Sequence, residues 1–257
     1  MKNITRFTIL LATMLSIGAM GLQAKTLKMC ADGRDWYPFT YKDKRTSKGM
    51  HIDLVSKALG DLGYTLQISP LPRNRCMKIN AKNGTIDAVV SVSYEAELAE
   101  NLEFPPDSEK SGESPWRIMQ VDHMLVTHIN GDYEYNGDKS TFPQPVRIPR
   151  GETLTGELVK LGLKVEEAKG DKNNFAKLIR DKKGSVVSTS IIAEGMNKNK
   201  KMEGQFLIQS TPITSKSYHL AFSKAAKISA EEKKKIWEAI AKWRDDYVYM
   251  LGVYAQY

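Results

Sequence analysis

The sequence has few of the residues that build metal centres and covalent active sites. Its 257 residues include only two cysteines, Cys30 and Cys76, and four histidines. Neither set shows the short spacing between ligands that zinc sites require, so we predict no metal and no cofactor. No Gly-x-Ser-x-Gly motif occurs and no paired acid/base arrangement stands out. We therefore expect a protein that is not an enzyme.

Long hydrophobic runs are also scarce. One run extends from Phe7 to Leu22, after the basic residues Lys2 and Arg6, and is followed by the small Ala24. It is shorter than the about 20 residues that a transmembrane helix needs, and threonine, serine and glycine interrupt it. This pattern predicts a signal peptide at residues 1–24 and export of a soluble mature chain. The alternative is an uncleaved membrane anchor.

If the chain is exported as predicted, it rarely meets nucleic acid, and its cysteines lie where disulfides persist. The formal net charge is +8, but the lysines gather in short runs such as 233–235, with no nucleic-acid-binding motif around them. We expect solvated faces and no nucleic-acid partner. An oxidising compartment favours a disulfide between Cys30 and Cys76, the alternative being two free buried thiols.

The mature chain of about 230 residues is long enough for two lobes, each with its own core. Its first part alternates between strand and helix patterns. The expected elements are a strand at Leu27–Cys30, a helix from Met50, a strand at Tyr64–Ser69, a helix opened by Pro72 and closed by Asn83-Gly84, and a buried strand at Ile86–Val92.

A similar series follows. It comprises a strand at Val146–Ile148, a helix at Glu152–Leu161, a strand at Leu163–Glu166, a helix capped by Asp171 and a buried strand at Ser185–Thr189. An extended run from Trp116 to Thr127 leads into this series. A strand at Ser217–Phe222 and a helix begun by Ser229 lead back from it.

These patterns predict an α/β fold of two doubly wound lobes joined by extended hinge crossovers. Lobe 1 would comprise residues 25–123 and 217–257, and lobe 2 residues 124–216. Solutes bind beyond the carboxyl ends of parallel strands and between domains, so the cleft between the lobes is the expected ligand site.

The chain contains several short motifs whose order and spacing matter for the comparison that follows. They are Trp36-Tyr-Pro-Phe39, Gly49 with Ile52-Asp-Leu54, Leu71-Pro-Arg-Asn-Arg-Cys76, Gly84-Thr-Ile-Asp-Ala88 and Ile148-Pro-Arg-Gly151. With these motifs the chain resembles the family 3 periplasmic solute-binding proteins, which have the type II periplasmic binding fold. The resemblance covers nearly the whole mature chain. It implies a periplasmic monomer that captures a small-molecule ligand and presents it to an inner-membrane ABC permease or to the outer domain of a membrane sensor.

The resemblance also implies which residues contact the ligand. In the first lobe these are Asp32, Trp36, Tyr37, Ser91, Ser93 and Tyr94. Trp36 would stack on the ligand, the alternative being that its indole packs in the core. In the second lobe the expected contacts are Arg150, Thr153 and Ser190.

Two charges that amino-acid binders of this family use are missing. Leu98 stands where an arginine would hold the α-carboxylate, and Ser190 stands close to where an aspartate would accept the ammonium group. Burying a zwitterion without both partners is costly, which argues against an ordinary amino acid.

The arginines expected near the cleft, Arg34, Arg73, Arg75 and Arg150, favour instead a small polar ligand with an anionic group. The alternative is that these arginines face solvent or pair with Glu95, Glu97 or Glu152.

Two other functions remain open at this stage. The chain could be a module that binds proteins without any solute, as the missing charges suggest. It could also resemble the few members of this fold that dehydrate cyclic acids with a cleft carboxylate, for which Glu95, Glu97 and Glu152 are candidates.

Overall fold

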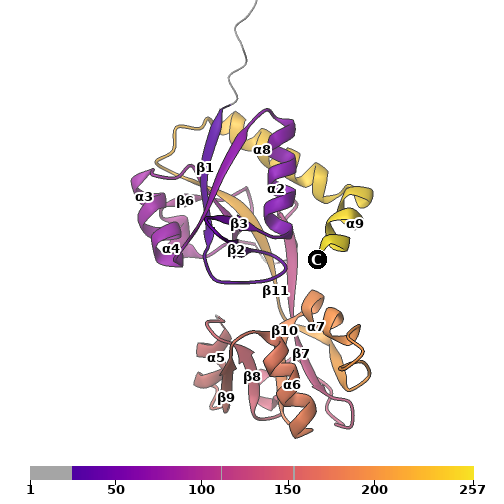
Figure 1. Ribbon diagram of the computed structural model, residues 1–257. Coiled ribbons are helices and arrows are strands. Elements are labelled where there is room, and N and C mark those ends of the chain that lie inside the picture. The colour runs from indigo at the N-terminus through magenta and orange to yellow at the C-terminus, as the bar shows by residue number, and fades with distance from the viewer. Residues whose placement is uncertain (1–24, 111, 153) are drawn as a thin grey trace, which may run out of the picture.

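The computed structural model describes residues 25–257 apart from Ser111 and Thr153. The predicted signal peptide at residues 1–24 and the candidate contact Thr153 therefore lie outside the described residues. Figure 1 shows two α/β bodies, one above the other, joined by the long strands β7 (Met119–His128) and β11 (Phe206–Ser223). We refer to them as the upper body or upper lobe, which holds β1, and the lower body or lower lobe, which holds β9.

One sheet runs through both bodies in the order β4-β1-β5-β11-β7-β10-β8-β9, with β6 paired to β11. Its remaining strands are β1 (Thr26–Asp32), β4 (Thr65–Leu71), β5 (Ala88–Ser93), β6 (Leu102–Glu103), β8 (Val146–Pro149), β9 (Val165–Ala168) and β10 (Ser185–Thr189). Strand β1 pairs in parallel with β4 and β5, and β8 pairs in parallel with β9 and β10. The parallel pairing places the carboxyl ends of these strands at the facing edges of the two bodies.

The helices agree with most of the sequence pattern. They are α2 (Met50–Asp61), the π-helical η1 (Arg75–Asn80), α3 (Ala81–Asn83), α4 (Ala96–Ala99), the 3-10 turn η2 (Lys139–Thr141), α5 (Leu154–Lys160), α6 (Asp171–Asp181), α7 (Ser190–Asn197), α8 (Ala230–Arg244) and α9 (Tyr247–Gln256). A small hairpin, β2 (Tyr41–Asp43) with β3 (Thr46–Lys48), precedes α2.

Local end signals explain where helices start and stop. The Ser229 side chain accepts a hydrogen bond from the Glu232 amide, so the predicted cap of α8 is confirmed. Gly84 closes α3 in the left-handed conformation, also as predicted. The prediction that Asp171 caps α6 is wrong, because Gly170 occupies the cap and Asp171 is the first helical residue. Its carboxylate turns instead to the Ser188 hydroxyl, 2.6 Å away.

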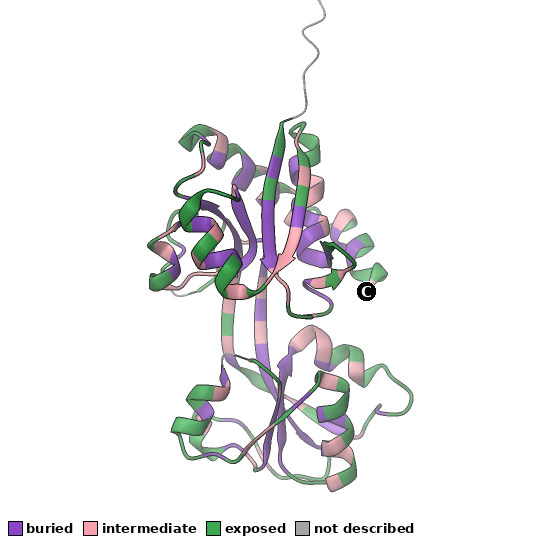
Figure 2. Ribbon diagram, turned by 60° about the vertical axis from the view of Figure 1, so that its left-hand side comes forward, coloured by how far each residue is buried: buried purple, intermediate pink, exposed green. Residues whose placement is uncertain are grey.

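Each body has its own buried core (Figure 2). In the upper body, α2 packs against α8 over β1 and β5, with Leu54 and Ile236 both fully buried. In the lower body, Phe175 of α6 packs on Phe206 of β11 with ring centroids 4.9 Å apart. The predicted plan of two α/β lobes with extended crossovers is confirmed, while the lobe limits at 123/124 and 216/217 stay a prediction.

A disulfide joins Cys30 of β1 to Cys76 of η1, as predicted, with 5.8 Å between the Cα atoms. Both cysteines are fully buried. The bond ties the carboxyl end of β1 to the start of the neighbouring helix. It thereby anchors the beginning of the loop that carries Trp36.

Candidate functional site

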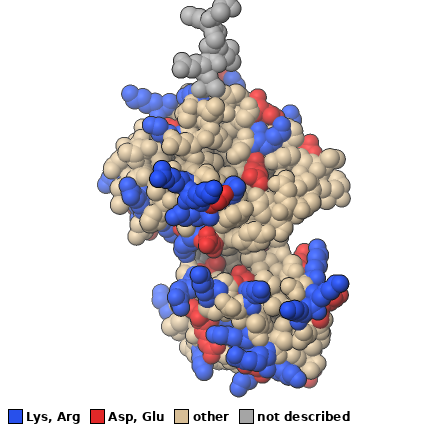
Figure 3. Space-filling view, viewed as in Figure 1, with Lys and Arg blue, Asp and Glu red and all other residues tan. Residues whose placement is uncertain are grey.

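A cleft of about 850 Å³ lies between the two bodies. The upper body contributes the loop after β1, the end of β5 and the C-terminal helix α9. The lower body contributes the loops after β8 and β9 together with α7, and the connecting strand β11 adds Lys216 and Tyr218. Figure 3 shows acidic side chains at the narrow level between the bodies. The carboxyl ends of the strands thus place the site where the topology of the sheet predicts it.

The cleft brings together most of the predicted contact residues. Those that line it are Asp32, Trp36, Tyr37, Arg73, Ser91, Ser93 and Arg150. Arg75, Tyr94 and Ser190 do not line it. Arg75 begins η1 with an exposed side chain, and the Tyr94 ring packs against Phe104 with centroids 5.3 Å apart. Ser190 is the first residue of α7, and the two residues after it, Ile191 and Ile192, line the cleft instead.

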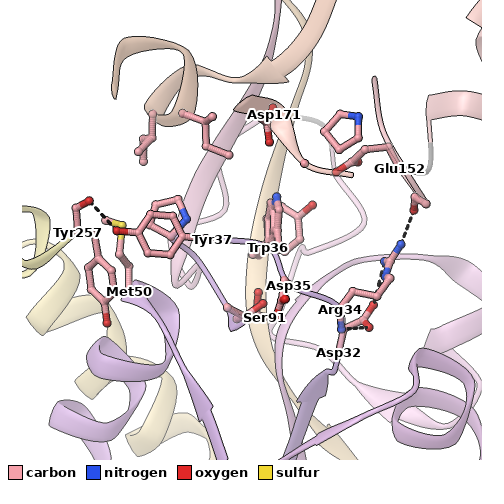
Figure 4. Close-up of a pocket in the computed structure, with 18 of the residues that line it drawn as sticks. Asp32, Arg34, Asp35, Trp36, Tyr37, Met50, Ser91, Glu152, Asp171 and Tyr257 are labelled. Atoms are coloured by element: carbon pink, nitrogen blue, oxygen red, sulfur yellow. Dashed lines mark hydrogen bonds and ion pairs between the residues drawn. The ribbon is translucent and has the colours of Figure 1, made fainter. Parts of the chain in front are cut away.

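Trp36 and Tyr37 form the aromatic wall of the upper body. The Trp36 ring packs on Phe39 and Tyr218, with centroids 4.4 Å and 4.8 Å away, which fixes the indole at the cleft surface. Tyr37 is 52% exposed and donates a hydrogen bond of 2.9 Å to the Tyr257 carbonyl oxygen (Figure 4). Trp36 therefore both packs against its own body and faces the cleft, and its stacking on a ligand stays a prediction.

Ser91 occupies a special position at the end of β5. It has a φ of 65° and is the extra residue of a β-bulge, because Val90 and Val92 pair with the adjacent residues Leu220 and His219 of β11. Its hydroxyl lies 2.7 Å from Nδ1 of His51, which is fully buried. Burial lowers the pKa of His51 to about 3, so the imidazole is neutral at pH 7. The histidine thus orients the Ser91 hydroxyl without adding charge.

Two of the expected arginines are engaged within their own body. Arg34 donates to the Asp32 carboxylate from Nε and Nη2, at 3.0 Å and 2.8 Å (Figure 4). Arg73 donates to Oε1 of Glu95 at 2.6 Å. The predicted alternative of pairing with glutamate therefore holds for Arg73. Arg34 also donates from Nη1 to the Gly151 carbonyl oxygen, which links the two bodies across the cleft.

The lower body contributes two carboxylates that the sequence analysis did not assign to ligand binding. Asp171 lies at the start of α6 and Glu152 in the loop before α5, and both line the cleft. Burial raises the pKa of Asp171. Nε2 of His123 lies 3.9 Å from Oε2 of Glu152, and burial lowers the pKa of this histidine to about 4. Asp171 follows the predicted parallel strand β9 closely, which could have indicated a place at the cleft. The sequence analysis assigned it to a helix cap instead and so did not consider it as a ligand contact.

The C-terminal helix α9 also reaches the site, which the sequence analysis missed. Tyr254 and Tyr257 line the cleft. The Tyr257 hydroxyl donates to Oδ2 of Asp53 at 2.6 Å and the Tyr249 hydroxyl donates to the Asp53 carbonyl at 3.1 Å. These bonds attach α9 to the first turn of α2, beside the cleft mouth.

Across residues 25–257 other than 111 and 153, no group of three or more His, Cys, Asp or Glu side chains could hold an ion. Over the same residues, no helix is both long and apolar enough to span a membrane.

Solved structures with the same arrangement identify the fold. An ancestral amino-acid-binding protein, described as a precursor of cyclohexadienyl dehydratase, matches with a TM-score of 0.61 and 17% identity over 90% of this chain and 94% of its own. The L-cystine solute receptor of Neisseria gonorrhoeae matches with a TM-score of 0.63 and 15% identity over 91% and 92%. A histidine kinase sensor domain similar to periplasmic binding proteins matches with a TM-score of 0.63 and 15% identity over 91% and 96%.

The chain has the type II periplasmic binding protein fold. The resemblance to family 3 solute-binding proteins is thus confirmed at the level of the fold. No family model matches the sequence, and no curated protein matches it either.

Leu98 and Ser190, the two positions where the resemblance predicts charged contacts in other members, both lie outside the cleft lining. Leu98 is 1% exposed and packs in a buried cluster with Cys30 and Cys76. It therefore belongs to the core of the upper body. Ser190 does not reach the cleft either.

Proposed function

We propose that this protein captures a small polar solute in the cleft between its two lobes and catalyses no reaction. The observation that carries the proposal is the cleft itself, whose volume of about 850 Å³ lies within the 300–1,000 Å³ typical of small-molecule sites. Its walls come from both lobes, so hinge closure would enclose a ligand. Aromatic rings, hydroxyl groups and charged groups of both signs line it, as expected for a polar solute.

The upper lobe would hold an anionic group of the solute. Arg73 lines the cleft together with Ser91 and Ser93, and its only described side-chain partner is Glu95, which accepts from one guanidinium nitrogen. The other nitrogens keep their N–H groups for a carboxylate or phosphate oxygen. Arg150 lies across the cleft with an exposed side chain. This arrangement supports the anionic character that the sequence suggested, with Arg73 in the central role.

The structural relatives fit a role in uptake or signalling. Their descriptions name an amino-acid-binding protein, a solute receptor and a sensor domain. We propose that the mature chain resides in the periplasm as a monomer and presents its ligand either to an inner-membrane ABC permease or to a membrane sensor.

The test is a thermal-shift and calorimetric screen of the mature protein, residues 25–257, against carboxylates, phosphates, sugars, peptides, amines and amino acids. A solute at 100 times its Kd should stabilise the protein by about 2.7 kcal/mol. Trp36→Ala should strongly weaken the binding of that solute. Trp243→Ala is the matched control, because Trp243 lies on α8 and does not line the cleft.

Two outcomes would contradict the proposal. If no class of solute stabilised the protein, it would act as a module that binds proteins without a ligand. Turnover of a prephenate-like acid by the mature protein would instead show the dehydratase activity that the cleft carboxylates leave open.

A further inference from the structure

The lower side of the cleft contains a recess that faces the Trp36 indole. Its polar lining consists of His123, Glu152, Asp171, Ser188 and Thr189, with Pro149, Val187 and Ile192 completing the walls. Figure 4 shows Asp171 and Glu152 on the lower lobe's side of the cleft, opposite Trp36. The recess therefore places two carboxylates across from an aromatic ring.

Asp171 is half-buried, and no cation of the described chain pairs with its carboxylate. Its Oδ1 accepts a hydrogen bond from Ser188 Oγ at 2.6 Å, and no lysine, arginine or histidine among the described residues forms an ion pair with it. The lysines Lys169, Lys172 and Lys216 line the wider cleft but not the recess. Enclosing a carboxylate without a cation is costly, so closure of the lobes over the recess favours a cationic occupant.

Two further groups point to a hydrogen-bonding occupant. Thr189 is 3% exposed and His123 is 6% exposed, yet Oγ1 of Thr189 and Nδ1 of His123 have no hydrogen-bond partner. Buried polar atoms are nearly always paired, so such orphans call for a ligand group or a water molecule. Both residues line the recess. A single group with several N–H donors would satisfy the hydroxyl, the ring nitrogen in its unprotonated form and the carboxylate together.

We propose that the recess binds the protonated amine of the solute, held by the Asp171 carboxylate and the Thr189 hydroxyl and covered by the face of Trp36. An ammonium group supplies three donors, and the indole face attracts cations. This inference rests on the proposed capture of a solute in the cleft. With Arg73 on the opposite lobe, it assigns a dipolar ligand, anionic toward the upper lobe and cationic toward the lower. The two charged partners come from positions other than Leu98 and Ser190, where the resemblance expects them.

The experiment compares matched probes by isothermal titration calorimetry with the mature protein. The probes are the common L-amino acids and 1,4-diaminobutane, each beside a counterpart without the amine: the deaminated carboxylic acid, or 1,4-butanediol. We expect at least one amine probe to bind and its counterpart to bind at least 10-fold more weakly. Asp171→Asn should lower the affinity for the amine probe by roughly 10- to 100-fold, the range that corresponds to a hydrogen bond to a charged group. It should change binding of the counterpart by less than 3-fold.

Glu194→Gln is the matched control, because this exposed carboxylate of α7 does not line the cleft. Thr189→Val, a nearly isosteric change, should weaken the binding of the amine probe and leave the binding of its counterpart unaffected. Thermal melting shows that each variant is folded. We expect Asp171→Asn to melt no lower than the wild type, since the variant removes a half-buried charge that has no cationic partner among the described residues.

The outcomes separate the two proposals. If the deaminated counterparts bind as tightly as the amines, or if Asp171→Asn leaves amine binding unchanged, the assignment of the recess is overturned while solute capture stands. If neither these probes nor any solute of the wider screen binds, both proposals fail.

Discussion

Three fully or almost fully buried histidines should make the folded protein sensitive to mild acid. His51 and His219 are 0% exposed and His123 is 6% exposed. Burial lowers the pKa of His51 to about 3 and the pKa values of His123 and His219 to about 4, from an ordinary value of 6.5. Each imidazole is therefore neutral in the folded protein throughout the range above pH 5.

The sign and size of the effect follow from proton linkage. Above pH 6.5 both states hold neutral histidines, so these groups make no contribution. As the pH falls below that value, the histidines of the unfolded chain bind protons, whereas the buried histidines of the folded protein do not. The free energy of unfolding therefore falls by about 1.4 kcal/mol for each histidine and each pH unit. At pH 5 each histidine then costs about 2 kcal/mol and the three together about 6 kcal/mol. The loss continues until the pH reaches the folded pKa values.

The carboxyl groups contribute little in this window, because their ordinary pKa values lie near or below 4.5. Asp171 acts in the opposite direction, since burial raises its folded pKa and its protonation stabilises the folded state as the pH falls. It therefore offsets part of the histidine effect wherever the two overlap, and comparing the wild type with a histidine variant that keeps Asp171 isolates the histidine contribution.

Urea denaturation of the mature protein at pH 7.5 and pH 5.0 measures the effect. The wild type should lose about 6 kcal/mol of unfolding free energy between the two values, and His51→Asn should lose about 2 kcal/mol less. Asparagine can still place a polar atom near Ser91, and the variant's own value at pH 7.5 serves as its control. A variant that loses as much as the wild type would refute the assignment of His51 as a buried neutral group. A wild type that is equally stable at both values would refute the reasoning for all three.

Three further predictions concern stability and are checked by urea denaturation. Reduction of the Cys30–Cys76 disulfide, which spans a sequence separation of 46, should lower the free energy of unfolding by about 4 kcal/mol; an unchanged value with the thiols shown to be free would contradict this. Arg147→Ala should cost about 2–3 kcal/mol, because Arg147 is 1% exposed and loses its hydrogen bonds to Asp181 at 2.7 Å and to the Lys183 carbonyl at 2.9 Å, while Asp181 keeps its pair with Arg180; a loss below 1 kcal/mol would speak against a tight pair. Gly184→Ala should cost about 1–3 kcal/mol or more, because φ is +81° and a Cβ atom would lie 2.4 Å from a backbone oxygen; a neutral effect would show that this turn adapts easily.

The elements that the sequence predicted well are those determined by neighbouring residues. Strand β5 and strand β10 are continuous runs of small and β-branched residues, and both are buried along nearly their whole length. Ser229 caps its helix through a residue three positions away, which the sequence displays directly. The disulfide followed from having only two cysteines in a chain that the sequence predicts to be exported, so no choice of partner arose.

The parts that escaped prediction depend on contacts between distant residues. The helix α9 has no clear polar face, and what fixes it is the pair of hydrogen bonds from Tyr249 and Tyr257 to Asp53, about 200 residues away in sequence. For Arg73 the sequence left open whether the side chain faces the cleft, faces solvent or pairs with a glutamate, because its bond to Glu95 depends on two segments 22 residues apart that meet only in the fold. Asp171 illustrates the same limit: local pattern suggested a helix cap, whereas Ser188 of a neighbouring strand takes its carboxylate.

The distribution of charge across the cleft explains how such a site could select its solute. On the upper lobe, the guanidinium groups of Arg34 and Arg73 already have carboxylate partners, so an anionic group of the solute joins pairs that exist without it. On the lower lobe, Asp171 has a serine hydroxyl as its partner and no cation among the described residues. Closure around a solute without a positive group would bury this carboxylate further without a compensating charge, which is costly. A solute with a protonated amine removes that penalty, so the lower lobe sets the stricter requirement on the ligand.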